Sequence, residues 1–546
     1  MKMNKKKYFT KFASIVASAL LLVSACGGGA TTTGEVVLNR AQAQPVNTLN
    51  NLGTSESAVS QVLVNVMEGL VVKALDGTIQ PSGAESYEIS ENGIVYTFNL
   101  RENTWANGTP VTAHDYVYGL QLNATLPGAK YSHYQEFLVN GTAVVKGDLP
   151  PSELGVKALD DMTLEITLVK PLTYFIQHLA HFSFFPVNEA FFTAQGNNYG
   201  TAVGTILENG AFTLTEFGGD TGYTLEKRAE YWDANNVKVD KIVTKIIPQL
   251  ETQSALFDSG EVDEIYLNGD LVDKYEGASE FQNELDNSMY LLYISPFVSD
   301  NASMYANKNF RAAVAHAIDK SILTERVAKD GSLPADFLIP TSVKDEEDGV
   351  AFREYADQYN DLMFNVETAQ KYLAAAKAEL GVETITMPMA VDDRDSNRRL
   401  WESIQGQIEQ NLPGVTVDLN VIPNALYFPK LYEFTTPSAR HGWNSALNDP
   451  SGFLAMFTAT SGNNFGQVKL DKYSELIAES EGATAMTGKL KDRWTIIVEA
   501  EEELLEQYYN IPLFQKGNAK LVRNGVNGLS YETGEQNTNY RWVTKK

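Results

Sequence analysis

Three short segments of this chain carry residue types that could perform catalysis or bind a metal, but each segment lacks a required group. Residues 482–489 resemble a phosphate-binding loop, yet five residues instead of four separate the two glycines, and Leu490 replaces the Ser or Thr that would bind Mg²⁺. Residues 393–397 begin like a calcium loop, but Arg398 stands where the turn glycine is needed. We therefore expect the first segment not to hold Mg²⁺, and we interpret the charges of the second as solvated side chains.

Two histidines, His178 and His181, form the third segment, because a spacing of three can place both imidazoles on one helix face. Neither a third ligand nor an intervening Glu completes a zinc site, and the flanking phenylalanines favour packing. The sequence also contains no G-x-S-x-G nucleophile segment. We expect no enzyme activity, no metal and no cofactor; a surface hydrolase acting on peptides or glycans is the rival class.

The N-terminus has the pattern of an export signal. Lysines precede an apolar run from Phe12 to Val23, which is shorter than the ~20 residues of a membrane-spanning helix. Small residues then lead to Cys26, the single cysteine of the chain, in a pattern that resembles a lipobox; an ordinary cleavage site with a chance cysteine is the alternative. We predict a lipoprotein signal peptide over 1–25, lipidation of Cys26, for instance with palmitate, and a glycine-rich flexible tether over 26–34.

The remainder of the chain has the composition of a globular protein. Its 546 residues exceed one ordinary core, so two or more domains are expected. An apolar share of 43% supports real cores, and the net charge of −26 argues against nucleic acid or anionic lipid headgroups as partners. No segment after the signal is apolar enough to span a membrane, so we expect a soluble body.

Hydrophobic periodicity predicts short strands that alternate with amphipathic helices, an α/β or α+β plan. Residues 96–100 and 164–168 alternate as half-buried strands do. Residues 366–380 have helical spacing between an N-capping Asn365 and Gly381.

A second helix is predicted from the apolar stripe of Trp494, Ile497, Leu504 and Tyr508, with Pro512 ending it. Stripes of this kind indicate core packing and not a cofactor site.

Ten short motifs, in a fixed order, together resemble family 5 of the extracellular solute-binding proteins, the oligopeptide- and dipeptide-binding lipoproteins of ABC importers. They are Glu68-Gly69-Leu70, residues 96–101, 105–115, 154–161, 209–212, 231–232, 259–263, 310–314, 317–320 and 511–513. The resemblance covers nearly the whole mature chain. It implies an α/β, two-lobed periplasmic-binding-protein-like fold with an additional inserted domain in the first lobe.

The resemblance also implies domain limits and a function. Residues 35–80, 190–285 and 510–546 are expected to form lobe I, 81–189 the inserted domain and 286–509 lobe II. The family's members capture oligopeptides outside the cell and deliver them to the permease subunits of an ABC importer. We expect a monomer, anchored by lipid to the outer face of the cell membrane, that closes on its ligand by hinge motion. A peptide-pheromone or sensory surface lipoprotein is the alternative.

In this family a Trp-centred segment of lobe II faces the peptide backbone, and here it spans residues 439–450. The resemblance assigns ligand contacts to eight residues: Gly442, Trp443, Asn444, Ala446, Arg440, Tyr131, Tyr293 and Ser57. Trp443 offers a flat apolar wall, although packing against the lobe with Gly442 as a turn is the alternative. Arg440, Arg398 and Arg399 are candidate partners for the ligand's C-terminal carboxylate.

One position departs from the family pattern. Oligopeptide binders usually carry an Asp three residues after this Trp, where it pairs with the ligand's free α-amino group, and this chain has Ala446. Asn448 and Asp449 are not automatic substitutes, since a shift along a strand or turn changes side-chain direction. We expect N-acetylated peptides to bind about as well as free ones. A blocked peptide, a hydrophobic signalling peptide or a ligand that is not a peptide all fit this departure.

Overall fold

The structure is a computed structural model of the chain. It describes residues 34–54, 56–75, 77–297, 302–345, 349–356, 362–445, 449–459, 461, 463–482, 490–529 and 538–546. Residues Val36–Lys546 form one compact unit, so the predicted limits of the lobes and the inserted domain stay predictions. The signal peptide, Cys26 and Ala446 lie outside the described residues.

An eleven-stranded sheet in the described residues extends through both lobes. Its order is β15 (Val415–Ile422), β14 (Ile385–Asp392), β16 (Ser438–Trp443), β12 (Phe281–Ile294), β17 (Asn510–Val522), β11 (Glu264–Tyr266), β1 (Val37–Gln42), β10 (Lys241–Ile246), β9 (Gly222–Lys227) and β8 (Phe212–Phe217), while β13 (Leu333–Pro334) pairs with β17. Parallel and antiparallel pairs are mixed: β1 runs parallel to β10, and β12 runs antiparallel to β17. This mixed sheet with its covering helices confirms the predicted α/β fold class.

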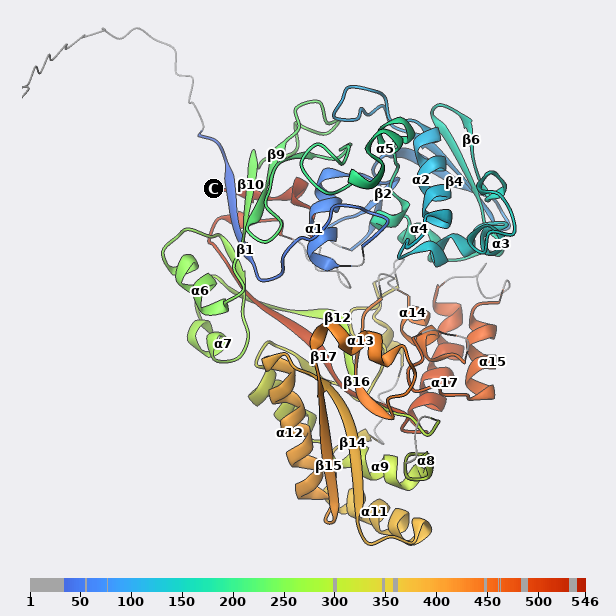
Figure 1. Ribbon diagram of the computed structural model, residues 1–546, viewed down its shortest axis with the longest axis vertical. Coiled ribbons are helices and arrows are strands. Elements are labelled where there is room, and N and C mark those ends of the chain that lie inside the picture. The colour runs from blue at the N-terminus through green and yellow to red at the C-terminus, as the bar shows by residue number, and fades with distance from the viewer. Residues whose placement is uncertain are drawn as a thin grey trace, which may run out of the picture. The chain divides into compact units, whose positions relative to one another are not determined.

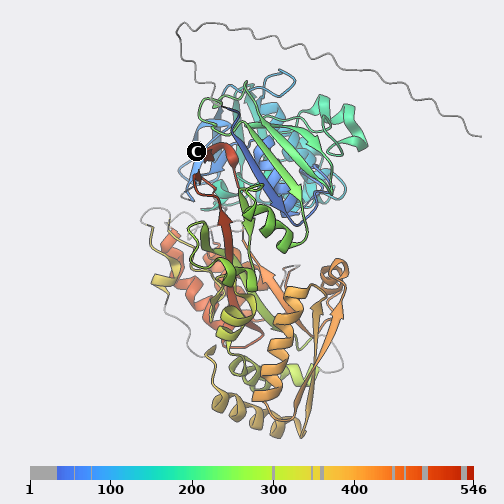
Figure 2. The same cartoon turned by 90° about the vertical axis from the view of Figure 1, so that its left-hand side faces the viewer.

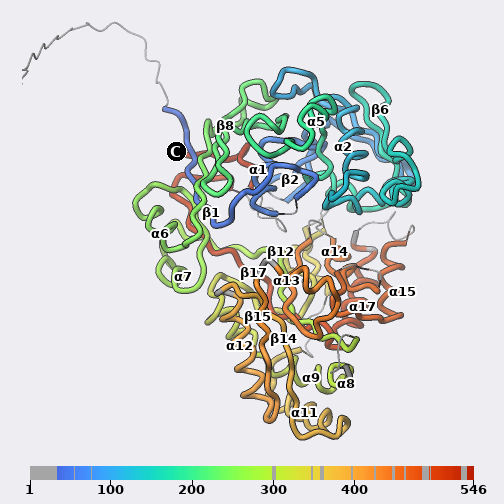
Figure 3. Tube along the Cα trace, in the orientation of Figure 1, coloured from blue at the N-terminus to red at the C-terminus, as the bar shows by residue number. Residues whose placement is uncertain are grey.

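The long strands β12 and β17 connect the two lobes (Figure 1). Strand β1, near the N-terminus, and the late strand β17 flank the short strand β11 (Figure 3), which is hydrogen-bonded to both. The β12–β17 ladder has two register shifts, one between Leu285 and Met289 and one between Tyr290 and Leu291. Pro512 pairs with Leu291 directly beside the second shift, an irregular position of the kind where a strand tolerates proline.

The prediction that Pro512 ends a helix is therefore wrong. The helix α17 spans Trp494–Leu505, and Tyr508 adopts a left-handed turn with φ 54° before β17 begins. The apolar stripe was read correctly up to Leu504, but propensity alone does not locate the reversal that returns the chain to the sheet.

Smaller sheets lie within the first half of the chain. An antiparallel sheet in the order β4 (Ala84–Ile89), β5 (Val95–Leu100), β7 (Thr163–Thr167) and β6 (Val156–Asp160) belongs to the inserted domain. Strands β5 and β7 confirm the two alternating patterns read from the sequence. Two antiparallel strand pairs complete the described strands: β2 (Val71–Lys73) with β3 (Ile79–Pro81), and, near the C-terminus, β18 (Val526–Asn527) with β19 (Thr544–Lys545).

The helices cover these sheets. Those of lobe I and the inserted domain are α1 (Ser57–Val66), α2 (Ala113–Thr125), α3 (Gly141–Val145), α4 (Phe175–His178), α5 (Glu189–Gln195), α6 (Leu250–Asp258) and α7 (Asp270–Tyr275). Those of lobe II are α8 (Ala302–Ala306), α9 (Lys308–Ala317), α10 (Phe352–Tyr355), α11 (Val366–Leu380), α12 (Asp395–Asn411), α13 (Asn424–Leu431), α14 (Ser451–Leu454), α15 (Asp471–Ser480) and α17. Helix α12 packs beside β14 and β15 (Figure 2). Helix α11 confirms its prediction, since Asn365 accepts a hydrogen bond from the Thr368 N–H and Gly381 is left-handed.

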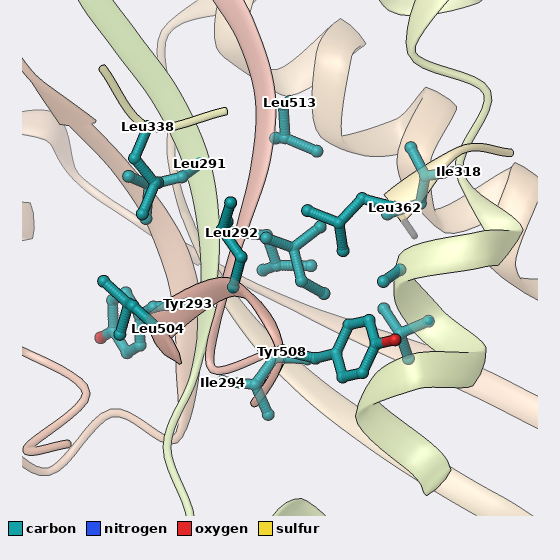
Figure 4. Close-up of a cluster of buried hydrophobic side chains, with 14 of the residues drawn as sticks. Leu291, Leu292, Tyr293, Ile294, Ile318, Leu338, Leu362, Leu504, Tyr508 and Leu513 are labelled. Atoms are coloured by element: carbon teal, nitrogen blue, oxygen red, sulfur yellow. The ribbon is translucent and has the colours of Figure 1, made fainter. Parts of the chain in front are cut away.

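Each region has a core of its own. The lobe II core gathers side chains from β12, β17 and the surrounding helices (Figure 4). Separate clusters fill the inserted domain and the two parts of lobe I. Among the described residues, no helix is both long and apolar enough to cross a membrane.

Three of the family motifs meet at one buried residue, Glu68, which is 1% exposed. It accepts hydrogen bonds from the Tyr231 hydroxyl at 2.7 Å and the Trp232 indole at 2.9 Å, and it pairs with Arg541 at 3.0 Å. The Glu68 N–H donates to the side chain of Asn209. These contacts join the three segments of the predicted lobe I, and the Asn103 amide, which donates to the Glu68 carboxylate at 3.4 Å, adds the predicted inserted domain. The motifs therefore explain the fold and not the choice of ligand.

Candidate functional site

Strand β16 carries the predicted ligand-contacting segment, and its two edges are paired unequally. On one side it pairs with β12 along its whole length. On the other side it meets β14 at the single pair Ala390↔Ala439. Among the strands that the structure describes, residues 440–443 therefore have no strand partner on the β14 side. The Arg440 carbonyl accepts a hydrogen bond from the Tyr427 hydroxyl at 2.9 Å, and Arg440 and His441 are buried, so Gly442 and Trp443 are the accessible part of this edge. An extended peptide can add to such an edge through main-chain hydrogen bonds.

Trp443 is held in place at the end of this strand. Its indole N–H donates to the Gly452 carbonyl at 3.0 Å, and its half-buried ring packs on the lobe II core near the His441 ring. Part of the ring stays accessible. One orientation of Trp443 is therefore compatible both with packing on the lobe and with an apolar wall for a ligand. Asn444 follows the strand and is exposed.

Gly442 has room in front of it. A Cβ atom built there would meet the Arg440 guanidinium at 3.5 Å and the Tyr290 ring at 3.6 Å, which are ordinary contacts. Sterics inside the protein therefore do not require a glycine at this position. The absence of a side chain leaves the main chain accessible to an incoming ligand.

Arg440 is committed to another residue of the protein. Its side chain is 4% exposed and pairs with Asp392 at 3.0 Å. Asp392 also accepts from Arg394 at 2.8 Å and from the Asn397 amide at 3.0 Å. Burial alone would raise the pKa of Asp392, but the hydrogen bond from Arg394 and the charge of Arg440 outweigh it and lower that pKa. Arg394 is 44% exposed, so it presents more of its guanidinium to a ligand than Arg440 does.

Two polar cavities lie beside the strands that connect the lobes. The lobe I cavity, of about 280 Å³, is lined among others by Ser57, Gln42, Gln61, Gln253, Tyr266 and Asn518. The lobe II cavity, of about 230 Å³, is lined among others by Tyr290, Arg394, Asn397, Arg399 and Phe514. Asn268, Asp330 and Lys516 line both cavities. The predicted residues Ser57 and Arg399 thus border concave space on different lobes.

The two predicted tyrosines lie elsewhere. Tyr293 is 1% exposed in the lobe II core (Figure 4), where its hydroxyl donates to the Thr436 carbonyl at 3.3 Å. Tyr293 is a residue of β12, and in this conformation its side chain anchors that strand in the lobe II core and presents no surface to a ligand. Tyr131 is half-buried in an aromatic cluster, 4.4 Å from the His181 ring and 5.4 Å from the Tyr134 ring between centroids. Neither tyrosine borders the two cavities.

The histidine pair is part of the same aromatic cluster. His178 is buried, and burial lowers its pKa to about 3, with the neighbouring His181 and His133 acting in the same direction. Helix α4 ends at His178, so the two rings are not on one helix face. Within the described residues, no group of three or more His, Cys, Asp or Glu side chains could hold a metal ion.

Sequence reasoning missed Arg394, Asn268, Asp330 and Lys516. Arg394 lies in residues 393–397, the segment that begins like a calcium loop, and nothing in that pattern indicates that it pairs with Asp392. One feature of the sequence could have indicated Lys516: it is a cation that follows a largely apolar run and precedes a glycine. Asn268 follows β11 and Asp330 follows the helical turn Ile322–Ala328, and only the tertiary fold brings these two segments together.

Comparison with known proteins places the chain in a family. Residues 78–465 match the bacterial extracellular solute-binding proteins, family 5, and the chain belongs to that family. OppA of Salmonella typhimurium, a periplasmic oligopeptide-binding protein, is 29% identical over 88% of this chain and 86% of its own length. The dipeptide-binding protein DppE of Bacillus subtilis is 29% identical over 86% of this chain and 84% of its own length.

Solved structures agree with this placement. The substrate-binding domain of an oligopeptide ABC transporter from Bacillus anthracis has a TM-score of 0.82 at 32% identity, covering 94% of this chain and 99% of that one. Listeria monocytogenes OppA bound to peptide has a TM-score of 0.80 at 30% identity, covering 94% and 100%. The pheromone receptor PrgZ has a TM-score of 0.81 at 26% identity, covering 94% and 100%. The two-lobed fold expected from the resemblance is confirmed.

Proposed function

We propose that this protein captures oligopeptides outside the cell and hands them to the permease of an ABC importer, without catalysing a reaction. The observation that carries the proposal is the edge of β16 at Gly442 and Trp443, which has no strand partner on the β14 side among the described residues. Main-chain pairing suits a receptor for many peptides, because the backbone is the one feature that all peptides share. Relatives named for oligopeptide and dipeptide binding support the same ligand class.

The predicted contacts divide into direct and supporting roles. Gly442, Trp443, Asn444 and Ala446 form the segment along the ligand backbone, and Ser57 faces it from lobe I. Arg440 acts by holding Asp392 and Arg394 in position, while Tyr293 supports β12 from the core. Tyr131 contributes through the aromatic cluster of the inserted domain. Closure about β12 and β17 is favoured only by the difference in ligand affinity between the closed and open forms.

A peptide-sensing role is the second candidate. The likeness to the pheromone receptor PrgZ, with a TM-score of 0.81, favours it. Peptide uptake assays on a deletion strain separate the two candidates, since a transporter component is required for uptake and a sensor is not.

The protein purified without its first 25 residues is expected to bind peptides from an oligopeptide pool, detected by native mass spectrometry and titration calorimetry. Trp443→Ala is expected to weaken peptide binding ~10-fold or more, because it removes the apolar wall beside the ligand backbone. Trp105→Phe, buried in the predicted inserted domain, serves as the control and is expected to leave the peptide affinity unchanged in the same calorimetric titration. Binding of sugars or metal ions in place of peptides would overturn the proposed function.

We further propose that Cys26 carries a lipid that holds the protein at the outer face of the membrane. Cys26→Ser is expected to release the protein into the medium or periplasm, because two acyl chains provide stable anchoring and the acidic body offers none. Peptide affinity is expected to be unchanged. Fractionation with and without detergent checks the release, and membrane retention of the variant would count against the lipid anchor.

A further inference from the structure

Lys516 occupies an unusual position on the strand that connects the lobes. It is half-buried in β17 and borders both the lobe I cavity and the lobe II cavity. Within the described part of the chain, Asp330 and Asn268 are the other residues that border both. A side chain at this junction can reach a ligand group placed in either cavity.

The local backbone directs this side chain. The register shift between Leu285 and Met289 leaves residues 286–288 bulged opposite Lys516, and bulges re-aim side chains next to functional sites. On one side of Lys516, Gln515 is buried and donates to the Asp286 carbonyl at 2.8 Å. On the other side, a Cβ on Gly517 would meet the Gly331 carbonyl carbon at 2.2 Å, so only glycine lets the loop with Asp330 approach.

Lys516 is charged but not committed to a single partner. Among the described residues Lys516 forms no ion pair, whereas the neighbouring Lys520 pairs with Glu284 at 3.0 Å. Burial alone would lower the pKa of Lys516, but the Tyr290 phenol and the carboxylates of Asp286 and Asp330 outweigh it and raise that pKa. The ammonium therefore stays protonated and keeps donors available.

The lobe II cavity is basic within a strongly acidic protein. Its charged lining consists of Arg394, Arg399 and Lys516 against Asp330 alone, while the whole chain has a net charge of −26. A Cβ atom built on Gly269 of lobe I would lie 4.0 Å from the Arg399 guanidinium. A cation from lobe II therefore faces lobe I across the cavity. A concave site lined by cations from two lobes favours an anionic ligand group.

We propose that Lys516 determines ligand specificity by binding a carboxylate of the peptide at the junction of the two cavities. The carboxylate belongs either to an acidic side chain or to the C-terminus of the ligand. This inference rests on the proposed peptide-binding function and names the class of peptide that the site selects.

The test uses alanine-based pentapeptides in which each position in turn is Glu or Gln, and the same peptides with a free or amidated C-terminus. Titration calorimetry on the native protein is expected to show, for one position or for the C-terminus, ~10- to 100-fold tighter binding of the carboxylate than of the amide. Lys516→Gln is expected to remove that preference, and Lys516→Arg to retain most of it.

Lys472→Gln is the matched control, because Lys472 is 65% exposed on α15 and pairs with Glu503 away from both cavities. Thermal unfolding of each variant confirms that it is folded. If the native protein binds the peptides but ranks each acid and its amide equally, the inference is overturned and the proposed function stands. If Lys516→Gln weakens acid and amide alike, Lys516 is structural. If the native protein binds no pentapeptide, the proposed function fails as well.

Discussion

Glu68→Ala is expected to destabilise the protein by about 3–5 kcal/mol, the usual cost of breaking a buried ion pair from one side. The substitution leaves Arg541 buried without its carboxylate, and it removes the acceptor of the Tyr231 and Trp232 donors. Urea denaturation with a fluorescence readout measures the change in the free energy of unfolding. A reduction of this size would bring many proteins close to unfolding, since total stability is about 5–15 kcal/mol.

Two controls make the result specific. Glu85→Ala removes an exposed carboxylate from β4 and is expected to change stability by less than about 0.5 kcal/mol. Glu68→Gln keeps one acceptor oxygen and is expected to be less damaging than alanine. If Glu68→Ala and Glu85→Ala have the same stability, the contacts of the Glu68 carboxylate do not stabilise the fold as described.

Asp449→Ala is expected to cost a similar ~3–5 kcal/mol, because Asp449 and Arg493 form an ion pair in which both side chains are 0% exposed. Asp449 also accepts from the Ser451 N–H at 2.8 Å, and Arg493 donates to the Ser480 carbonyl at 2.7 Å. The pair therefore fixes the chain that follows β16. Chemical denaturation of the single variants and of the double variant Asp449→Leu with Arg493→Met tests this, and the double variant is expected to regain most of the lost stability.

This pair also bears on ligand recognition. Asp449 is the acid nearest to Trp443 in sequence, and its carboxylate accepts hydrogen bonds from Arg493 and from the Ser451 N–H. It is therefore not free to replace the missing acid at Ala446 in binding a ligand ammonium. Equal stability of Asp449→Ala and the native protein would contradict both statements.

The sequence by itself determined the parts of this protein that depend on local pattern. The period of two in residues 96–100 and 164–168 gave strands β5 and β7, and the caps at Asn365 and Gly381 gave both ends of α11. The ordered motifs identified the family because their residues meet at shared structural points, such as the Glu68 carboxylate. These features need only neighbours along the chain or a fold already known to use them.

The tertiary structure decided which side chains are available to a ligand. Arg440 and Tyr293 were expected at the ligand, but the packing of β14 and β12 places one in an ion pair with Asp392 and the other in the lobe II core. Lys516 and Asp330 are 186 residues apart in the sequence. The bulge in β12 and the close approach of the chain at Gly517 bring them to the junction of the two cavities. Burial, pairing and cavity position depend on contacts between distant segments, and a local pattern carries no record of those contacts.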